Sequence, residues 1–139
     1  MANEATINCG LQIRIGNLDY RSLPVSFRAS VSGIGGPSPG TIVATTAGVD
    51  VGFSQLLNPG LCRIMNLDTA NYIEWGIHDG VKFYPVGEVR PGECYVIRLA
   101  HLFGETDTAF GTGTVPSAAA LHIKANGASC PVLVEAFES

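Results

Sequence analysis

The segment Tyr72–Val86, with the sequence YIEWGIHDGVKFYPV, contains the clearest fold signal in the chain. Two runs rich in β-branched and aromatic residues flank the pair Asp79-Gly80. An Asp-Gly pair between such runs favours a two-residue type I′ turn, in which both turn residues need a positive φ. We therefore predict a β-hairpin centred on this pair.

A two-residue turn also determines which residues face each other across the two strands. We expect Trp75 to lie opposite Tyr84 in an aromatic cross-strand contact. Gly76 should lie opposite Phe83, whose ring would cover the space that a glycine leaves. These local preferences agree with one another, which supports the hairpin.

Most of the remaining chain also has the two-residue period of strands. Apolar and polar residues alternate over Ile7–Ile15 and Val25–Val31, as in half-buried strands. Further strands are expected at 61–67, 94–99, 121–125 and 131–137. No segment has a convincing period of 3.6 residues, and the length suits one domain. We predict an all-β chain, folded over residues 1–139 as a single β-sandwich or jelly-roll-like domain of about nine or ten short strands.

Turn sequences separate these strands. Residues 33–40 contain several glycines and two prolines, so we expect a loop there and not a sheet interior. Asn58–Gly60 and Arg90–Glu93 have the proline and glycine of tight turns. Asn66 and Asn71 flank another turn, where asparagine tolerates left-handed backbone geometry.

The composition favours a protein that is covered by another protein. Charged residues make up only 14% of the chain and hydrophobic residues 46%, whereas typical globular chains have about 25% charged residues. Such a surface is a liability for a free monomer, although an ordinary weakly charged monomer remains the alternative. The formal net charge is −4 and the basic residues are scattered, so we expect no nucleic-acid partner.

Membrane and secretion signals are not evident. The sequence has no run of about 18 apolar residues, so we expect no membrane span. Residues 1–4 lack the basic and apolar regions of a signal peptide. The cysteines at positions 9, 62, 94 and 130 form no CxxC pair, which argues against zinc or redox motifs. We expect four reduced, mostly buried thiols, with a disulfide possible in an oxidising environment.

Motifs of catalysis and metal binding are also missing. No GxSxG, P-loop or GxGxxG motif opens a helix. His101 with Glu105 and Asp107 is a conceivable metal group, but no second histidine joins it. His78 lies beside the hairpin turn. His122 alternates with apolar neighbours, so we expect it on the solvent-facing side of a strand.

Two further hypotheses concern sugars. Glu74 and Glu88 are a conceivable carboxylate pair for glycoside hydrolysis, but carboxylates on strand faces and turns are far more often solvated. A carbohydrate-binding module is the stronger rival, with a platform formed by Trp75, Tyr72, Tyr84 and Tyr95. We favour placing these rings in the core and the hairpin. We therefore expect no catalytic, cofactor-binding or metal-binding residues and no enzyme.

Three segments resemble small virion proteins of tailed bacteriophages. Pro59–Gly76, PGLCRIMNLDTANYIEWG, is similar to their strand N-L-D-x-x-N-Y-V-E, which follows a Pro-Gly turn. Phe83–Glu93 is similar to their F-Y-P … L-x-P-G-E signature, and Leu121–Phe137 to their closing L-x-x-K-A-N … V-E-x-x-F hairpin. The likeness covers about 60–137, a little over half of the chain, whereas the first 58 residues match less distinctively. These motifs specify strands and turns, so the resemblance transfers no catalytic residue.

The resemblance implies a virion structural component, made in the host cytoplasm. We expect a capsid decoration or cement protein that binds the major capsid protein or other virion subunits and self-associates as a homo-oligomer, without cofactor, nucleic acid or membrane. The candidate contact segments are the strand around Ile7–Ile15 and the loop 101–118. The alternatives are a neck, tail or fibre-attachment protein, or a carbohydrate-binding module.

Overall fold

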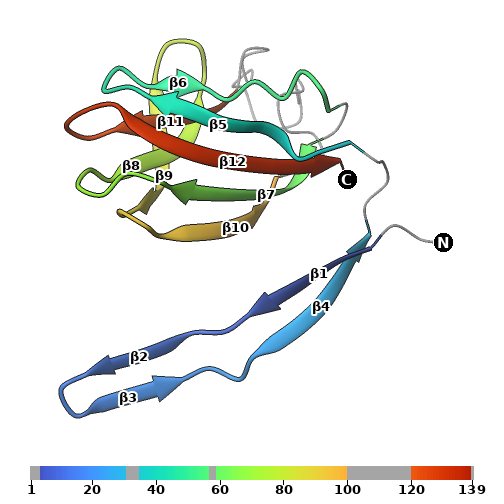
Figure 1. The fold of residues 1–139 in the computed structure, drawn as a ribbon, viewed down its shortest axis with the longest axis vertical. Coiled ribbons are helices and arrows are strands. Elements are labelled where there is room, and N and C mark those ends of the chain that lie inside the picture. The colour runs from blue at the N-terminus through green and yellow to red at the C-terminus, as the bar shows by residue number, and fades with distance from the viewer. Residues whose placement is uncertain (1–3, 31–34, 57–58, 100–119, 139) are drawn as a thin grey trace, which may run out of the picture. The chain divides into compact units, whose positions relative to one another are not determined.

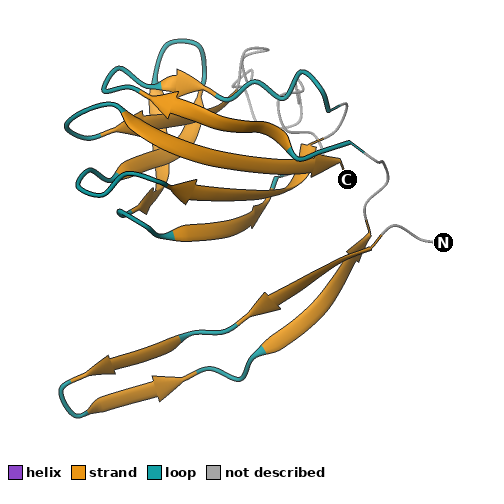
Figure 2. Cartoon of the chain, viewed as in Figure 1, coloured by secondary structure: helices purple, strands orange, loops and turns teal. Residues whose placement is uncertain are grey.

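The computed structural model describes residues 4–30, 35–56, 59–99 and 120–138. Every regular element in these ranges is a β-strand, as Figure 2 shows, which confirms the predicted all-β class. The described strands number twelve, slightly more than expected. Contacts divide the chain into two compact units, Met1–Ile34 and Gly35–Ser139. The sandwich was expected to span residues 1–139, whereas both of its sheets lie in the second unit.

The strand bounds are as follows. The first unit contains β1 (Glu4–Cys9), β2 (Gln12–Ile15), β3 (Leu18–Arg21) and β4 (Val25–Ser30). The second contains β5 (Ser38–Ala44), β6 (Val49–Asp50), β7 (Pro59–Asn66), β8 (Ile73–His78), β9 (Phe83–Val89), β10 (Cys94–Arg98), β11 (Ala120–Ala125) and β12 (Cys130–Glu138).

The first unit is an antiparallel two-stranded ribbon. β1 pairs with β4, and β2 pairs with β3. The expected continuous strand over Ile7–Ile15 is interrupted after Cys9, on the same level as a break in the facing chain at 22–24. Pro24 lacks the N–H that a ladder needs. Ser22 bridges the break, because its N–H donates to the Leu11 carbonyl at 2.8 Å and its hydroxyl accepts the Leu11 N–H at 2.8 Å.

The second unit is a sandwich of two four-stranded sheets. Their strand orders are β10-β7-β12-β5 and β6-β11-β8-β9, and all pairs are antiparallel. In Figure 1, β12 lies between β5 and β7 in the sheet nearer the viewer. The pairs are nested along the chain: β5 with β12, β6 with β11, β7 with β10 and β8 with β9. This nesting is the order of a jelly roll, one long hairpin rolled into two sheets, and it confirms the predicted sandwich.

Alternate residues of the strands form the core between the sheets. In β7, buried and half-buried residues alternate without a break, and β12 shows a similar alternation over most of its length. The buried core cluster consists of Ala44, Val51, Leu56, Cys62, Ile64, Ile73, Val89, Leu99, Leu121, Ile123, Ala125, Cys130, Val132, Val134 and Ala136. On the other face, Arg63 and Glu135 lie opposite in register and pair at 2.7 Å. The two-residue period thus places the core residues of the central strands inside the sandwich.

The hairpin of β8 and β9 forms, but its turn is not type I′. His78 pairs with Phe83, so four residues form the loop and not two. The Asp79 carboxylate accepts the N–H groups of Val81 at 2.8 Å and Lys82 at 2.6 Å. Among the described residues only glycines have a positive φ, whereas a type I′ turn requires one at Asp79 as well. The side chain of Asp79 therefore closes a longer turn.

The longer turn shifts the register, so both predicted cross-strand pairs are wrong. The observed pairs include Ile77 with Tyr84, Gly76 with Pro85 and Trp75 with Gly87, with a bulge between Trp75 and Gly76. A ring does cover a glycine, but at a different position: a Cβ on Gly87 would lie 2.5 Å from Nε1 of Trp75.

Asn66 supports its turn through its side chain and not through left-handed backbone. It is fully buried, and its φ is not positive. Its Nδ2 donates to the carbonyls of Asn71 at 2.8 Å and Val89 at 3.1 Å, and its Oδ1 accepts the Asp68 N–H at 3.0 Å. The predicted left-handed asparagine is therefore wrong, since the amide is used as a three-way hydrogen-bonding group.

The two proline-containing turns differ in outcome. The turn Arg90–Glu93 is confirmed, with the Glu93 N–H donating to the Arg90 carbonyl at 3.0 Å and Gly92 at φ 76°. The expected loop over 33–40 ends earlier, because β5 begins at Ser38 and Pro39 pairs with Glu135. A proline fits there because β5 is an edge strand of its sheet, where one side of the backbone needs no partner.

Candidate functional site

His122 is the central residue of the candidate site. It is buried, although it lies on the side of its strand that was expected to face solvent. Its neighbours Leu121 and Ile123 belong to the core cluster, so alternation turns the His122 side chain to the opposite face. That orientation was predicted. Only 6% of the residue is exposed, however, so the expectation of a solvated histidine is wrong. Other groups must cover it on this outer face.

Strand register brings two of these groups to His122. Asp50 of β6 lies directly opposite His122 of β11. On the other side of β11, His78 of β8 pairs with Ala120, which puts it on the diagonal from His122 and on the same face. Three strands that are far apart in the sequence thus supply one cluster, Asp50–His78–His122.

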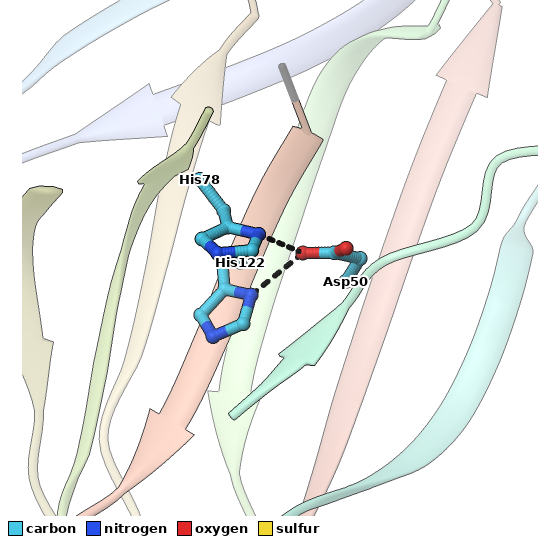
Figure 3. Close-up of side chains that lie close together, drawn as sticks. All are labelled: Asp50, His78 and His122. Atoms are coloured by element: carbon cyan, nitrogen blue, oxygen red, sulfur yellow. Dashed lines mark hydrogen bonds and ion pairs between the residues drawn. The ribbon is translucent and has the colours of Figure 1, made fainter. Parts of the chain in front are cut away.

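The three side chains converge on a single carboxylate oxygen (Figure 3). Nδ1 of His122 lies 2.6 Å from Oδ1 of Asp50, and Nδ1 of His78 lies 3.3 Å from the same atom. An ionised carboxylate only accepts hydrogen bonds, so Nδ1 of His122 donates to it. The approach of His78 lacks hydrogen-bond geometry, and its Nδ1 is a buried nitrogen without a hydrogen-bond partner.

A ring and a loop cover the cluster. The ring centroid of His122 lies 4.7 Å from that of His78 and 4.8 Å from that of Phe83. On its other side is Gly48, at φ 92°, where a Cβ would collide with the imidazole. Thr45 holds this loop, because its carbonyl accepts the Gly48 N–H at 3.0 Å and its hydroxyl donates to the Gly48 carbonyl at 3.1 Å.

The cluster is open to solvent on one side and lies apart from the cavity of the sandwich. Asp50 is the exposed member, with 52% of its side chain accessible, so solvent reaches the cluster from one side. A cavity of about 240 Å³ lies elsewhere in the sandwich and is lined by Trp75, Gly76, Ile77, Val86, Ile97, Arg98, Leu99 and Leu121. It includes neither histidine of the cluster, and its lining has no carboxylate.

The cluster was not predicted from the sequence, which pointed to other candidate residues. His101, Glu105, Asp107 and the loop 101–118 lie outside the described residues. Glu74 and Glu88 are brought together, since they are opposite in register. Glu88 also accepts from Nε of Arg90 at 2.9 Å, as a solvated surface carboxylate would.

Three of the four aromatic residues considered for a sugar platform, Trp75, Tyr84 and Tyr95, are not gathered on one surface. Trp75 packs against the core cluster. Tyr84 and Tyr95 belong to strands of different sheets. Their hydroxyls donate to Asp79 at 3.1 Å and Glu93 at 3.2 Å. These contacts tie the rings to their own turns.

All four cysteines are free, but only Cys62 and Cys130 are buried, whereas Cys9 and Cys94 are exposed. The expectation of reduced thiols agrees with this structure, and the expectation of burial holds for two of them. Two effects raise the pKa of Cys62 to about 12: burial of the thiol, which is the larger, and the nearby negative charge of Glu135. This thiol is therefore a core residue and not a nucleophile.

Comparison with known proteins gives no relative for the chain. In the described part of the chain, no helix is long and apolar enough to cross a membrane. No protein-family model matches the sequence, and neither a curated protein nor a solved structure is significantly similar to it.

Proposed function

We propose that this chain is a non-enzymatic structural component of a tailed-phage virion, a head decoration or cement protein that binds and stabilises the capsid shell. The motifs within residues 60–137 support this role by their resemblance to small virion proteins. The jelly-roll order is compatible with it, since viral capsid domains use that topology, as do lectins and cupins. Because one fold serves many functions, the role is inferred from the exposed surfaces of the molecule.

The exposed apolar residues of the ribbon are the observation that carries the proposal. Of the side chains described in the first unit, only Ile7 and Ala29 are buried. Its exposed large apolar residues are Leu11, Ile15, Leu18, Tyr20, Leu23, Val25 and Phe27. A two-stranded ribbon is marginally stable in water by itself, and exposed large apolar residues beyond those scattered singly favour an interaction site. The ribbon therefore gains most if shell subunits or further copies of the chain cover it.

The charges of the ribbon favour a protein partner over a nucleic acid. Arg14 pairs with Asp19 at 3.2 Å, and Arg28 pairs with Glu4 at 3.0 Å. Such exposed pairs add little stability, but they neutralise two of the ribbon's basic side chains locally. What remains for a partner is mainly apolar contact, which many copies on a shell would reinforce through multivalency.

Copy number in purified particles tests the role itself. Quantitative mass spectrometry of density-purified particles should find the chain in large copy number, comparable with that of the shell protein. A small number of copies would instead favour the neck, tail or fibre-attachment alternative. Absence from the particles would overturn the proposal.

A pair of matched variants tests the contact surface. Leu23 is 87% exposed in the ribbon, and Val81 is 83% exposed in the β8–β9 turn. Burial of a leucine is worth about 1.5–3 kcal/mol, so Leu23→Asp should weaken binding to shells that lack the protein by about tenfold or more. Val81→Asp, the control, should bind like the wild type. Equal binding by both variants and the wild type, measured by co-sedimentation, would contradict this use of the ribbon.

A further inference from the structure

We infer that Asp50, His78 and His122 form a binding site for a divalent transition-metal ion such as Zn²⁺. Two imidazole nitrogens and a carboxylate oxygen would be the ligands. This inference is independent of the proposed virion role. It rests on the convergence of three ligand types from three strands.

The donor set determines the class of ion. Imidazole nitrogen suits zinc, copper, nickel and iron, whereas magnesium and calcium prefer sites built from oxygen. Two histidines and one carboxylate are also the protein ligands of known zinc sites that keep one position open. At this cluster the open position would be on the solvent side, beside the accessible Asp50.

The three ligand atoms lie within 4.8 Å of one another, so binding an ion requires the side chains to move closer to tetrahedral spacing. Zinc lies about 2.0–2.2 Å from its nitrogen and oxygen ligands, so two tetrahedral ligand atoms are about 3.4 Å apart. Nδ1 of His78 and Oδ1 of Asp50 are already 3.3 Å apart. Nδ1 of His122 and the same oxygen are 2.6 Å apart, so this pair must separate by less than an ångström. Asp50 is half exposed and can make that movement.

The polar atom that lacks a partner is the second observation. The buried Nδ1 of His78 faces Asp50 but makes no hydrogen bond. A buried nitrogen without a partner has a free-energy cost that needs an explanation. A metal ion would bind the lone pair of this atom, and its binding to His122 would release to solvent the Nδ1 proton that now forms the hydrogen bond to Asp50.

The surroundings keep the imidazoles in place for binding. Phe83 and the loop at Gly48 confine the His122 ring from two sides. β6 is the edge strand of its sheet, and only two of its residues pair with β11. A bound ion would join β6, β11 and β8 by coordinate bonds, so it should stabilise this edge.

Metal titration of the purified full chain tests the site. Isothermal titration calorimetry with Zn²⁺ should show one ion bound per chain. Thermal unfolding should show a higher Tm when Zn²⁺ is present. Asp50→Asn keeps the size of the side chain but removes its charge, and His78→Gln removes one ligand. Each should weaken binding by more than the tenfold to roughly hundredfold typical for loss of an outer-shell group. His101→Gln, which changes the remaining histidine, is the control and should bind like the wild type.

Thiols are the main competing ligands, and Co²⁺ distinguishes them. Cobalt bound to the cluster should show the d–d bands of nitrogen and oxygen ligands without a thiolate charge-transfer band. Circular dichroism verifies that the variants are folded. Unchanged Zn²⁺ affinity in folded Asp50→Asn and His78→Gln, a thiolate band that persists in them, or no saturable binding by the wild type would each overturn the inference.

Discussion

Replacing Asn66 by alanine should destabilise the sandwich by about 3 kcal/mol. The side chain is fully buried and makes three hydrogen bonds, at 2.8, 3.1 and 3.0 Å. Each is worth about 1 kcal/mol net, and removal of one partner leaves the other buried group unsatisfied. Asn66→Ala leaves the carbonyls of Asn71 and Val89 and the N–H of Asp68 without their hydrogen-bond partner. The turn between β7 and β8 then loses its hydrogen bond to Val89 at the end of β9.

Urea unfolding followed by tryptophan fluorescence measures this effect. Trp75 is the single tryptophan and packs against the core of the sandwich, so its signal reports on the unit that contains Asn66. Asn126→Ala, at an exposed turn, is the matched control and should change the free energy of unfolding by less than about 0.5 kcal/mol. A loss below about 1 kcal/mol for Asn66→Ala would refute the role assigned to its amide.

Three further predictions follow from the same contacts. Two of the four thiols, the exposed Cys9 and Cys94, should react with Ellman's reagent in the folded chain, and all four should react after unfolding. Burial protects the other two and raises the pKa of Cys62 to about 12. A third thiol that reacts quickly in the folded chain would contradict this. The Asn71 and Ala70 N–H groups lower the pKa of Asp68 below its ordinary 3.8. The stability that the Asp68 carboxylate adds is therefore present above pH 3.8 and is lost as the pH falls through the lower pKa of the folded state. Asp68→Asn should flatten this part of the acid-unfolding curve, and an unchanged curve would argue against this role. Gly87→Ala should displace the ring of Trp75 and cost about 1–3 kcal/mol, seen as a shift in its emission, whereas Gly52→Ala, with open space around its Cβ, should leave the emission unchanged.

The fold class was predictable because two-residue alternation persists through most of the chain. In β11 the core residues Leu121, Ile123 and Ala125 alternate with His122 and Lys124, so the sequence alone identifies its inward face. Register was less predictable, because it depends on which groups close a turn. Asp79-Gly80 has the composition of a two-residue turn, yet the Asp79 carboxylate captures two later N–H groups. This turn places Ile77 opposite Tyr84, and the bulge between Trp75 and Gly76 then places Trp75 opposite Gly87.

The candidate site was not predictable, because it depends on pairing between distant strands. Asp50 and His122 are 72 residues apart, and only the nesting of β6 with β11 makes them neighbours. The usable signal was the alternation of side chains along each strand. His78 and His122 both occupy positions whose side chains point away from the core. With a jelly-roll order assumed in advance, these histidines would have fallen on one face of adjacent strands. Alternation alone left His122 as an isolated solvated residue.

Amide hydrogen exchange of residues 4–30, compared between the free chain and assembled particles, tests the central claim that the ribbon works by being covered. In the free chain we predict that β1–β4 exchange much faster than β7 and β12, since few of their side chains are buried. In the particle the same amides should become slow. Slow exchange in the free chain, equal to that of β7, or fast exchange that persists after assembly would contradict the claim.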